Sequence, residues 1–151
     1  MRSHPRHPCL WLTLPLAGCV EDFHLQVSAP CRAHKEKKTT PGRFLLWDLD
    51  FDTGAIKLVA SNNTLAIDTQ GQRISAETPA VLNAYDRNAA SQKWDFISKP
   101  NFILSVSNPS LCLDNKGRSI TDGNTVWLYP FNGSLAQEWA LVPLSNFKLA
   151  D

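Results

Sequence analysis

The stretch Ser107-Asn-Pro-Ser-Leu-Cys-Leu-Asp-Asn-Lys-Gly117 repeats an earlier part of the same chain, Ser61-Asn-Asn-Thr-Leu-Ala-Ile-Asp-Thr-Gln-Gly71. The displacement between them is a constant 46 residues, which brings Asp68 over Asp114. Each stretch is followed by a Gln-x-Trp motif, Gln92-Lys-Trp94 and Gln137-Glu-Trp139. Repetition at a fixed period indicates an architecture built from copies of one small unit. We therefore assign two copies, residues 48–94 and 95–139.

The match continues between the shared Asp and the Gln-x-Trp motif. Tyr85 lies over Tyr129 and Asn88 over Asn132, with one residue fewer in the loop of the first copy. Trp47 extends the period backward, since it precedes Trp94 by 47 residues. Leu45 stands where the Gln of the motif is expected. Trp47 is therefore interpreted as the last trace of a third copy.

Local patterns within the copies are typical of short strands. Brief runs rich in branched residues alternate with Gly- and Asn-bearing turns, whose residues tolerate the positive φ that tight turns need. These runs are Ala55–Ala60, Ile103–Ser107, Leu111–Leu113, Thr125–Tyr129 and Trp139–Val142. No segment after residue 43 keeps the apolar spacing of a helix of normal length. The sequence therefore predicts an all-β domain.

The composition divides the chain into two parts. Residues 1–43 hold seven Lys and Arg against three Asp and Glu, whereas residues 44–151 hold eight against eleven. We predict an N-terminal segment over residues 1–43 and a single domain over residues 44–151. The formal net charge is only +1, so no global field favours nucleic acid or an anionic membrane as a partner.

The N-terminal segment has two interpretations. The apolar run Cys9–Gly18 follows Arg2 and Arg6 and has the length of a signal-peptide core, far too short to insert across a membrane. That interpretation predicts secretion. Prolines at positions 5, 8 and 15 would interrupt the helix of a signal. The alternative is a degenerate or non-native N-terminus, with a cytoplasmic location left open.

The second copy resembles one repeat of a ricin-B type lectin, or family-13 carbohydrate-binding module. The matching strings are Leu111-Cys-Leu-Asp114, Asp122-Gly-Asn-Thr-Val126, Tyr129-Pro-Phe-Asn132 and Gln137-Glu-Trp139. This resemblance covers residues 48–144 and implies a β-trefoil, in which three such units close a barrel under a hairpin cap. With two recognisable repeats, the first lobe is either divergent or missing. An incomplete barrel would leave unpaired strand edges, and self-association is then expected.

The resemblance also implies binding of galactose-type sugars on glycans or glycoproteins. A sugar needs a carboxylate or amide for hydrogen bonds and an aromatic face for its C–H side. Carried over to this sequence, the carboxylate is Asp114, the stacking ring is Tyr129 and the loop amide is Asn132. Trp127 is predicted to add a second apolar wall. The corresponding residues of the first copy are Asp68, Tyr85 and Asn88, and the motif glutamines Gln137 and Gln92 either contact the sugar or brace the backbone.

The match to a sugar-binding repeat is incomplete. Many such repeats carry Asn directly before the Gln of Gln-x-Trp, where this chain has Ala136 and Ser91. Cys112 sits where the family commonly has half of a disulfide, but the expected partner position holds Phe131. We therefore predict that Cys112 is a small buried apolar residue.

Catalysis is not expected from this chain. Residues 44–151 contain no His, so neither a Ser/His/Asp nor a Cys/His set can be assembled within the repeats. No cofactor and no metal site are predicted. The alternative function is a β-trefoil scaffold that binds protein, such as a protease inhibitor, because a fold never fixes a function. An inhibitor needs only one special loop, so the Asp and Tyr repeated in both copies favour the sugar.

Overall fold

The computed structural model describes residues 9–13, 44–119 and 123–141, and this part of the chain consists of strands, turns and short 3-10 segments. No helix in these ranges is long and apolar enough to cross a membrane. The all-β class predicted from the short branched runs is confirmed.

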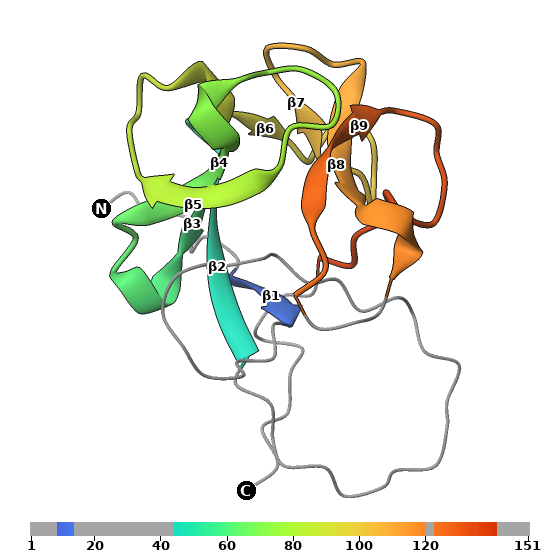
Figure 1. Cartoon of the computed structure of the whole chain (residues 1–151). Helices are drawn as coiled ribbons and strands as arrows, with labels where there is room; N and C mark the ends of the chain where they lie inside the picture. Colours follow the sequence, from blue (N-terminus) through green and yellow to red (C-terminus); the bar gives the residue numbers. More distant parts are fainter. Residues whose placement is uncertain (1–8, 14–43, 120–122, 142–151) are drawn as a thin grey trace, which may run out of the picture.

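The strands form two antiparallel sheets (Figure 1). The first sheet has the order β1-β2-β3-β4-β5, and the second has the order β6-β7-β8-β9. The bounds in the first sheet are β1 Cys9–Thr13, β2 Phe44–Asp50, β3 Ala55–Leu58, β4 Leu65–Thr69 and β5 Ala80–Ala84. Those in the second are β6 Trp94–Asp95, β7 Leu104–Ser105, β8 Leu111–Asn115 and β9 Val126–Pro130.

The strand register repeats with the sequence. Lys57 lies opposite Ala66 in the first sheet, as Leu104 lies opposite Cys112 in the second. Strands β2–β5, here called the first unit, therefore form the same meander as β6–β9, the second unit. One expected strand differs, because Trp139–Leu141 have no strand pairing, and Val142 lies outside the described residues.

The tryptophans of the repeat form the centre of the core. Trp47, Trp94 and Trp139 are at most 2% exposed. The indole N–H of Trp94 donates to the carbonyl of Ile67 at 3.0 Å, and that of Trp139 donates to the carbonyl of Leu113 at 3.1 Å. Each Gln-x-Trp motif is thereby tied to the strand that carries the shared Asp, and Trp94 and Trp139 are core residues. The indole N–H of Trp47 is buried and has no partner among the described residues.

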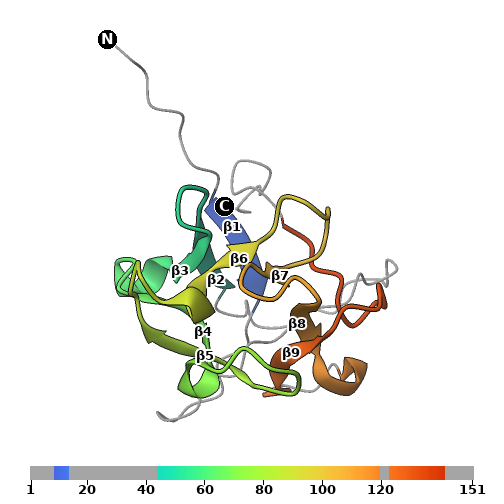
Figure 2. The ribbon, with the colours of Figure 1, turned by 90° about the horizontal axis from the view of Figure 1, so that it is seen from above.

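The two units are joined along β9. The N–H of Glu77 donates to the carbonyl of Leu128 at 2.7 Å, and the N–H of Leu128 donates to the carbonyl of Thr78 at 2.8 Å. The segment before β5 therefore extends the edge of the second unit, and in Figure 2 the two units lie side by side.

Strand β1 adds to the other side of the first unit. It pairs antiparallel with β2 along its whole length, from Cys9 opposite Asp48 to Thr13 opposite Phe44. Part of the segment before residue 44 is thus a strand of the first sheet.

Candidate functional site

The shared Asp of each unit occupies the same place in the fold. Asp68 in β4 lies opposite Val81 of β5, and Asp114 in β8 lies opposite Trp127 of β9. A 3-10 turn follows each, at Gln70–Gln72 and at Lys116–Arg118. The central glycine of each turn has a positive φ, 64° at Gly71 and 66° at Gly117, a conformation that glycine adopts without strain.

The motif glutamine of the second unit connects this carboxylate to a loop. The side-chain amide of Gln137 donates to Asp114 Oδ2 at 3.1 Å and to the carbonyl of Pro130 at 2.9 Å. Its oxygen accepts from the N–H of Asn132 at 2.8 Å and of Gly133 at 3.1 Å. The amide nitrogen and the amide oxygen of Gln137 thus both use their hydrogen-bonding capacity within the protein. Gln137 is therefore a bracing residue, the alternative that the sequence left open.

Gln92 makes the same bonds in the first unit. Its amide donates to Asp68 Oδ2 at 3.1 Å and to the carbonyl of Ala84 at 2.9 Å, and its oxygen accepts from the N–H of Asp86 at 2.9 Å. It is 2% exposed. Both glutamines hold the end of a hairpin against the shared Asp.

The second unit adds an aromatic pair to its carboxylate. The indole N–H of Trp127 donates to Asp114 Oδ1 at 3.0 Å. The rings of Trp127 and Tyr129 stack, with centroids 5.3 Å apart and planes 15° apart, and both residues are half-buried. Asp114 is 6% exposed, and each of its oxygens accepts one hydrogen bond from the described residues and retains a lone pair for a further donor. The predicted carboxylate and stacking ring therefore belong to one connected group, with Trp127 between them.

The carboxylate of the first unit is more completely enclosed. Asp68 is 0% exposed, and its oxygens accept from the N–H of Thr69 at 2.6 Å and from the amides of Asn83 at 3.0 Å and Gln92 at 3.1 Å. Burial raises the pKa of Asp68, but the nearby Ser91 hydroxyl and these hydrogen bonds outweigh burial and leave the pKa lowered. The acceptor oxygens of this carboxylate are therefore used by hydrogen bonds within the protein.

The strand register corrects the alignment of the first unit. Asn83 lies opposite Ala66, as Tyr129 lies opposite Cys112, so Asn83 and not Tyr85 is the counterpart of Tyr129. The Tyr85 hydroxyl donates to Thr53 Oγ1 at 3.4 Å, and its ring lies 5.2 Å from the Lys57 ammonium. These contacts belong to the start of the first unit and not to the Asp68 group.

The same correction applies to the loop amide. Gln92 receives the N–H of Asp86 where Gln137 receives that of Asn132, so Asp86 is the counterpart of Asn132. In this register the first loop is one residue longer than the second, because Asp86 precedes Gln92 by six residues and Asn132 precedes Gln137 by five. Asn88 is exposed, and its N–H donates to Asp86 Oδ1 at 2.8 Å. The alignment of Asn88 with Asn132 was wrong because it matched Tyr85 to Tyr129, which changes the displacement from 46 to 44 residues.

The loop of the second unit presents Asn132 to solvent. Asn132 is exposed, and its side-chain oxygen accepts the N–H of Ser134 at 2.9 Å, which leaves its amide N–H groups free of any bond within the described residues. Ala136 is buried, and its carbonyl accepts the N–H of Asn115 at 2.8 Å. The position before the motif glutamine therefore supplies backbone bonding and no side-chain amide.

Nucleophilic chemistry has no support in this part of the chain. Cys112 is a free cysteine with 0% exposure, as predicted for a small apolar residue. Burial, with a contribution from the charge of Asp114, raises the pKa of its thiol to about 12. No group of three or more metal-binding side chains lies together among the described residues.

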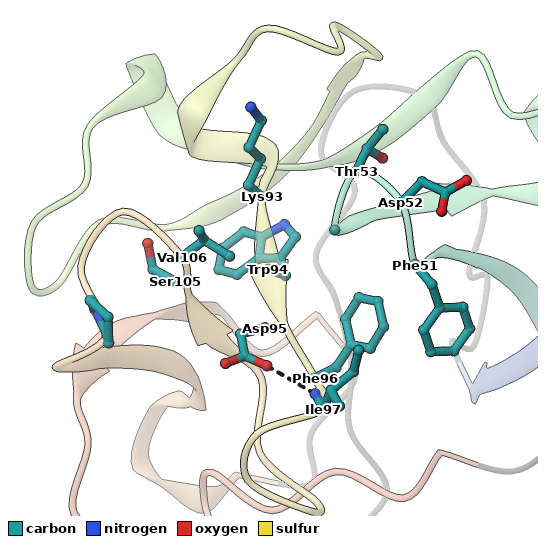
Figure 3. A pocket seen from close by; sticks show the side chains of 12 residues that line it. Phe51, Asp52, Thr53, Lys93, Trp94, Asp95, Phe96, Ile97, Ser105 and Val106 are labelled. Carbon is teal, nitrogen blue, oxygen red and sulfur yellow. Dashed lines mark hydrogen bonds between the residues drawn. The ribbon is translucent and has the colours of Figure 1, made fainter.

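A separate pocket of about 350 Å³ lies between the turn after β2 and strands β6 and β7 (Figure 3). Its walls are largely apolar and include Phe51, Phe96, Ile97 and Val106. The Asp95 carboxylate at its base accepts the N–H groups of Ile97 at 3.0 Å and Ser98 at 2.9 Å. None of the predicted sugar-binding residues lines this pocket. Its polar lining residues are Asp52, Thr53, Lys93, Asp95 and Ser105. The Asp114 group joins a predicted carboxylate to a predicted stacking ring, so it is the better candidate for a sugar site.

Comparison with known proteins agrees with this fold. The model of the ricin-type β-trefoil lectin domain matches residues 52–148. Among solved structures, an agglutinin from Abrus precatorius is similar at 21% identity and a TM-score of 0.60, over 91% of this chain and 48% of that one. The chain thus spans about half the length of that agglutinin.

Two further structures are similar over nearly their whole length. The C-terminal half of an earthworm R-type lectin, solved with GalNAc, has 21% identity and a TM-score of 0.54, over 90% of this chain and 98% of that one. ThreeFoil, a designed threefold-symmetric protein, has 18% identity and a TM-score of 0.62, over 90% and 99%. At these identities the likeness establishes the fold. A search among curated proteins gave no match.

Proposed function

Because the chain belongs to the ricin-type β-trefoil lectin domain family, we propose that it is a non-catalytic lectin module that binds galactose-type sugars at one site in its second unit. The observation that carries this proposal is the connected group of Asp114, Trp127 and Tyr129. Asp114 offers acceptors for sugar hydroxyls, and Tyr129 offers a half-buried ring for the C–H face.

Pre-organisation supports this assignment. Gln137 and Trp127 fix the carboxylate from two sides, so little conformational freedom remains to be lost when a sugar binds. Gln137 also holds the backbone at Asn132, whose free amide lies in the neighbouring loop. In this proposal the sugar contacts Asp114, the Tyr129 ring and the Asn132 amide.

The first unit does not share this role in our proposal. Asp68 is enclosed by the protein, and Asn83 takes the place of the stacking ring and donates to the carboxylate. The amide of Asn83 thus occupies the acceptor that a sugar hydroxyl would need. We infer that the first unit serves the fold and the second unit serves the ligand.

Glycans and glycoproteins are the partners that this site favours. Such partners are met outside the cell, so we propose that the protein is secreted. The weaker alternative is a protein-binding scaffold that acts through an exposed loop. A loop inhibitor would not require the arrangement of carboxylate and stacked rings around Asp114.

The experiment is a solid-phase binding assay on immobilised lactose, with Asp114→Ala and Tyr129→Asn as variants. We expect retention of the unmodified protein, elution by free galactose, and loss of retention in both variants. Asp52→Ala is the matched control, because Asp52 is an exposed carboxylate outside the group. Thermal unfolding must show that each variant is folded. Absence of retention on any glycan, together with inhibition of a protease, would replace the lectin assignment with the scaffold.

A further inference from the structure

A cation stands at the rim of the proposed sugar site. The Lys116 ammonium lies 4.6 Å from the centroid of the Trp127 ring, and Trp127 is bonded to Asp114. Lys116 is exposed, so its ammonium group lies over the aromatic face while its remaining donors stay accessible.

No acidic side chain among the described residues forms a salt bridge with this cation. Within the described ranges, the salt bridges join Lys57 to Asp48 and to Asp50, and neither Lys116 nor Arg118 takes part in one. An ammonium without an acidic partner keeps its capacity for a charge-assisted hydrogen bond to a ligand. Arg118, in the same turn, adds a second positive charge to the local field.

The turn itself does not require these charges. The equivalent turn of the first unit carries Gln70 and Gln72 where the second carries Lys116 and Arg118. The backbone is nearly the same, since φ is 57° at Gln72 and 56° at Arg118. Glutamine is therefore sufficient for the fold at both positions. At these two positions the positive charges occur only in the second unit, whereas the first unit carries its positive charge one residue later, at Arg73.

We propose that this site takes galactose-type sugars that carry an anionic group, a sulfate ester or a carboxylate, and that Lys116 recognises that group. The inference rests on the proposed sugar binding at Asp114 and Tyr129. A negative substituent near the Asp114 carboxylate would be repelled unless a cation lay beside it, and Lys116 supplies that cation. Neutral hydroxyls would still be read by Asp114, so the lysine determines specificity rather than basal binding.

The test compares three immobilised probes, namely neutral galactose, galactose carrying a sulfate ester, and galactose carrying sialic acid. We expect one charged probe to bind about tenfold more tightly than the neutral one, the scale of a charge-assisted hydrogen bond. Lys116→Gln should abolish this preference and leave neutral binding unchanged. The two charged probes distinguish sulfate from carboxylate as the preferred group.

Lys99→Gln is the matched control, because Lys99 is also an exposed cation near an aromatic ring, 4.7 Å from the centroid of Phe131. It should keep the full preference for the charged probe. Equal binding to all three probes would overturn the inference and leave the lectin assignment standing. A preference that survives Lys116→Gln would also overturn it. Failure to bind any of the probes would overturn the proposed function itself.

Discussion

Asn83 occupies in the first unit the strand position that Tyr129 occupies in the second, since each lies opposite the residue two places before its unit's shared Asp. This single difference separates the two units chemically. Tyr129 presents a ring beside Trp127, whereas Asn83 donates its amide to Asp68 at 3.0 Å. The same hairpin thus carries an amide bonded to the carboxylate in one unit and a half-buried aromatic ring in the other.

Substituting Tyr129 by the residue of the sister unit tests this difference directly. Tyr129→Asn should weaken galactose binding about tenfold or more through loss of the stacking face, while the protein stays folded. Tyr85→Phe serves as the control, because it removes only the hydroxyl bonded to Thr53 and should leave affinity unchanged. Isothermal titration with lactose measures both. Equal losses in the two variants would contradict the corrected alignment.

The two motif glutamines should differ in function but not in stability. Gln92→Ala and Gln137→Ala each remove a buried amide with bonds to an Asp, a backbone carbonyl and a backbone N–H. Each should lower the free energy of unfolding by about 1–3 kcal/mol, measured by urea denaturation. Only Gln137→Ala should also weaken sugar binding, because it releases Asp114 and the Asn132 loop. A binding loss of the same size in Gln92→Ala would contradict a single site.

The buried Asp68 should make the fold sensitive to acid. Its pKa is lowered in the folded state from the ordinary value of 3.8, so its contribution to stability is present above that value and is lost as pH falls through the folded pKa. Asp68→Asn should cost about 1–3 kcal/mol at neutral pH, because the amide brings a donor against the donors of Asn83 and Gln92.

The pH dependence of this stability loss tests whether it comes from the Asp68 charge. The difference in unfolding free energy between the unmodified protein and Asp68→Asn should shrink as pH falls from about 7 to about 2. Thermal unfolding at each pH measures it. A difference that stays constant over this range would show that the Asp68 charge does not contribute.

Gly54 should tolerate no side chain. Its φ is 75°, and a Cβ there would lie 2.9 Å from the backbone oxygen of Trp94. Because both the strained φ and the close contact involve the backbone, movement of a side chain cannot relieve them. Gly54→Ala should lower the unfolding free energy by about 1–3 kcal/mol. Gly71→Ala is the comparison, because φ is 64° there but nothing lies within 4 Å of the added carbon. An equal loss of unfolding free energy in the two variants would show that the close approach to Trp94 adds no destabilisation beyond that of the positive φ.

The sequence predicted the fold because its signal lies in the residues that make the core. Trp94 and Trp139 end the two Gln-x-Trp motifs, are buried and bond back to the strands that carry the shared Asp. The spacing from Asp68 to Asp114 was therefore a structural period, and it correctly identified β4 and β8 as equivalent strands.

The candidate site was harder to predict, because side-chain identity competed with strand register. Pairing Tyr85 with Tyr129 placed the change in displacement between the two copies too early in the chain. The constant displacement of 46 residues carried past the shared Asp would have placed Asn83 opposite Tyr129. Leu82 and Leu128, which match in that frame, were the signal. The bond from Trp127 to Asp114 had no signal in the sequence, since it depends on the side-chain geometry of a cross-strand pair.

The most direct test is an NMR titration of the labelled protein with lactose, which locates the site and counts it at once. A single site in the second unit predicts one binding event, with shifts at Asp114, Trp127, Tyr129 and Asn132 and none at Asp68 or Asn83. Shifts of equal size at Asp68 and Asn83, or no shifts with lactose or its charged derivatives, would contradict a single carbohydrate site in the second unit.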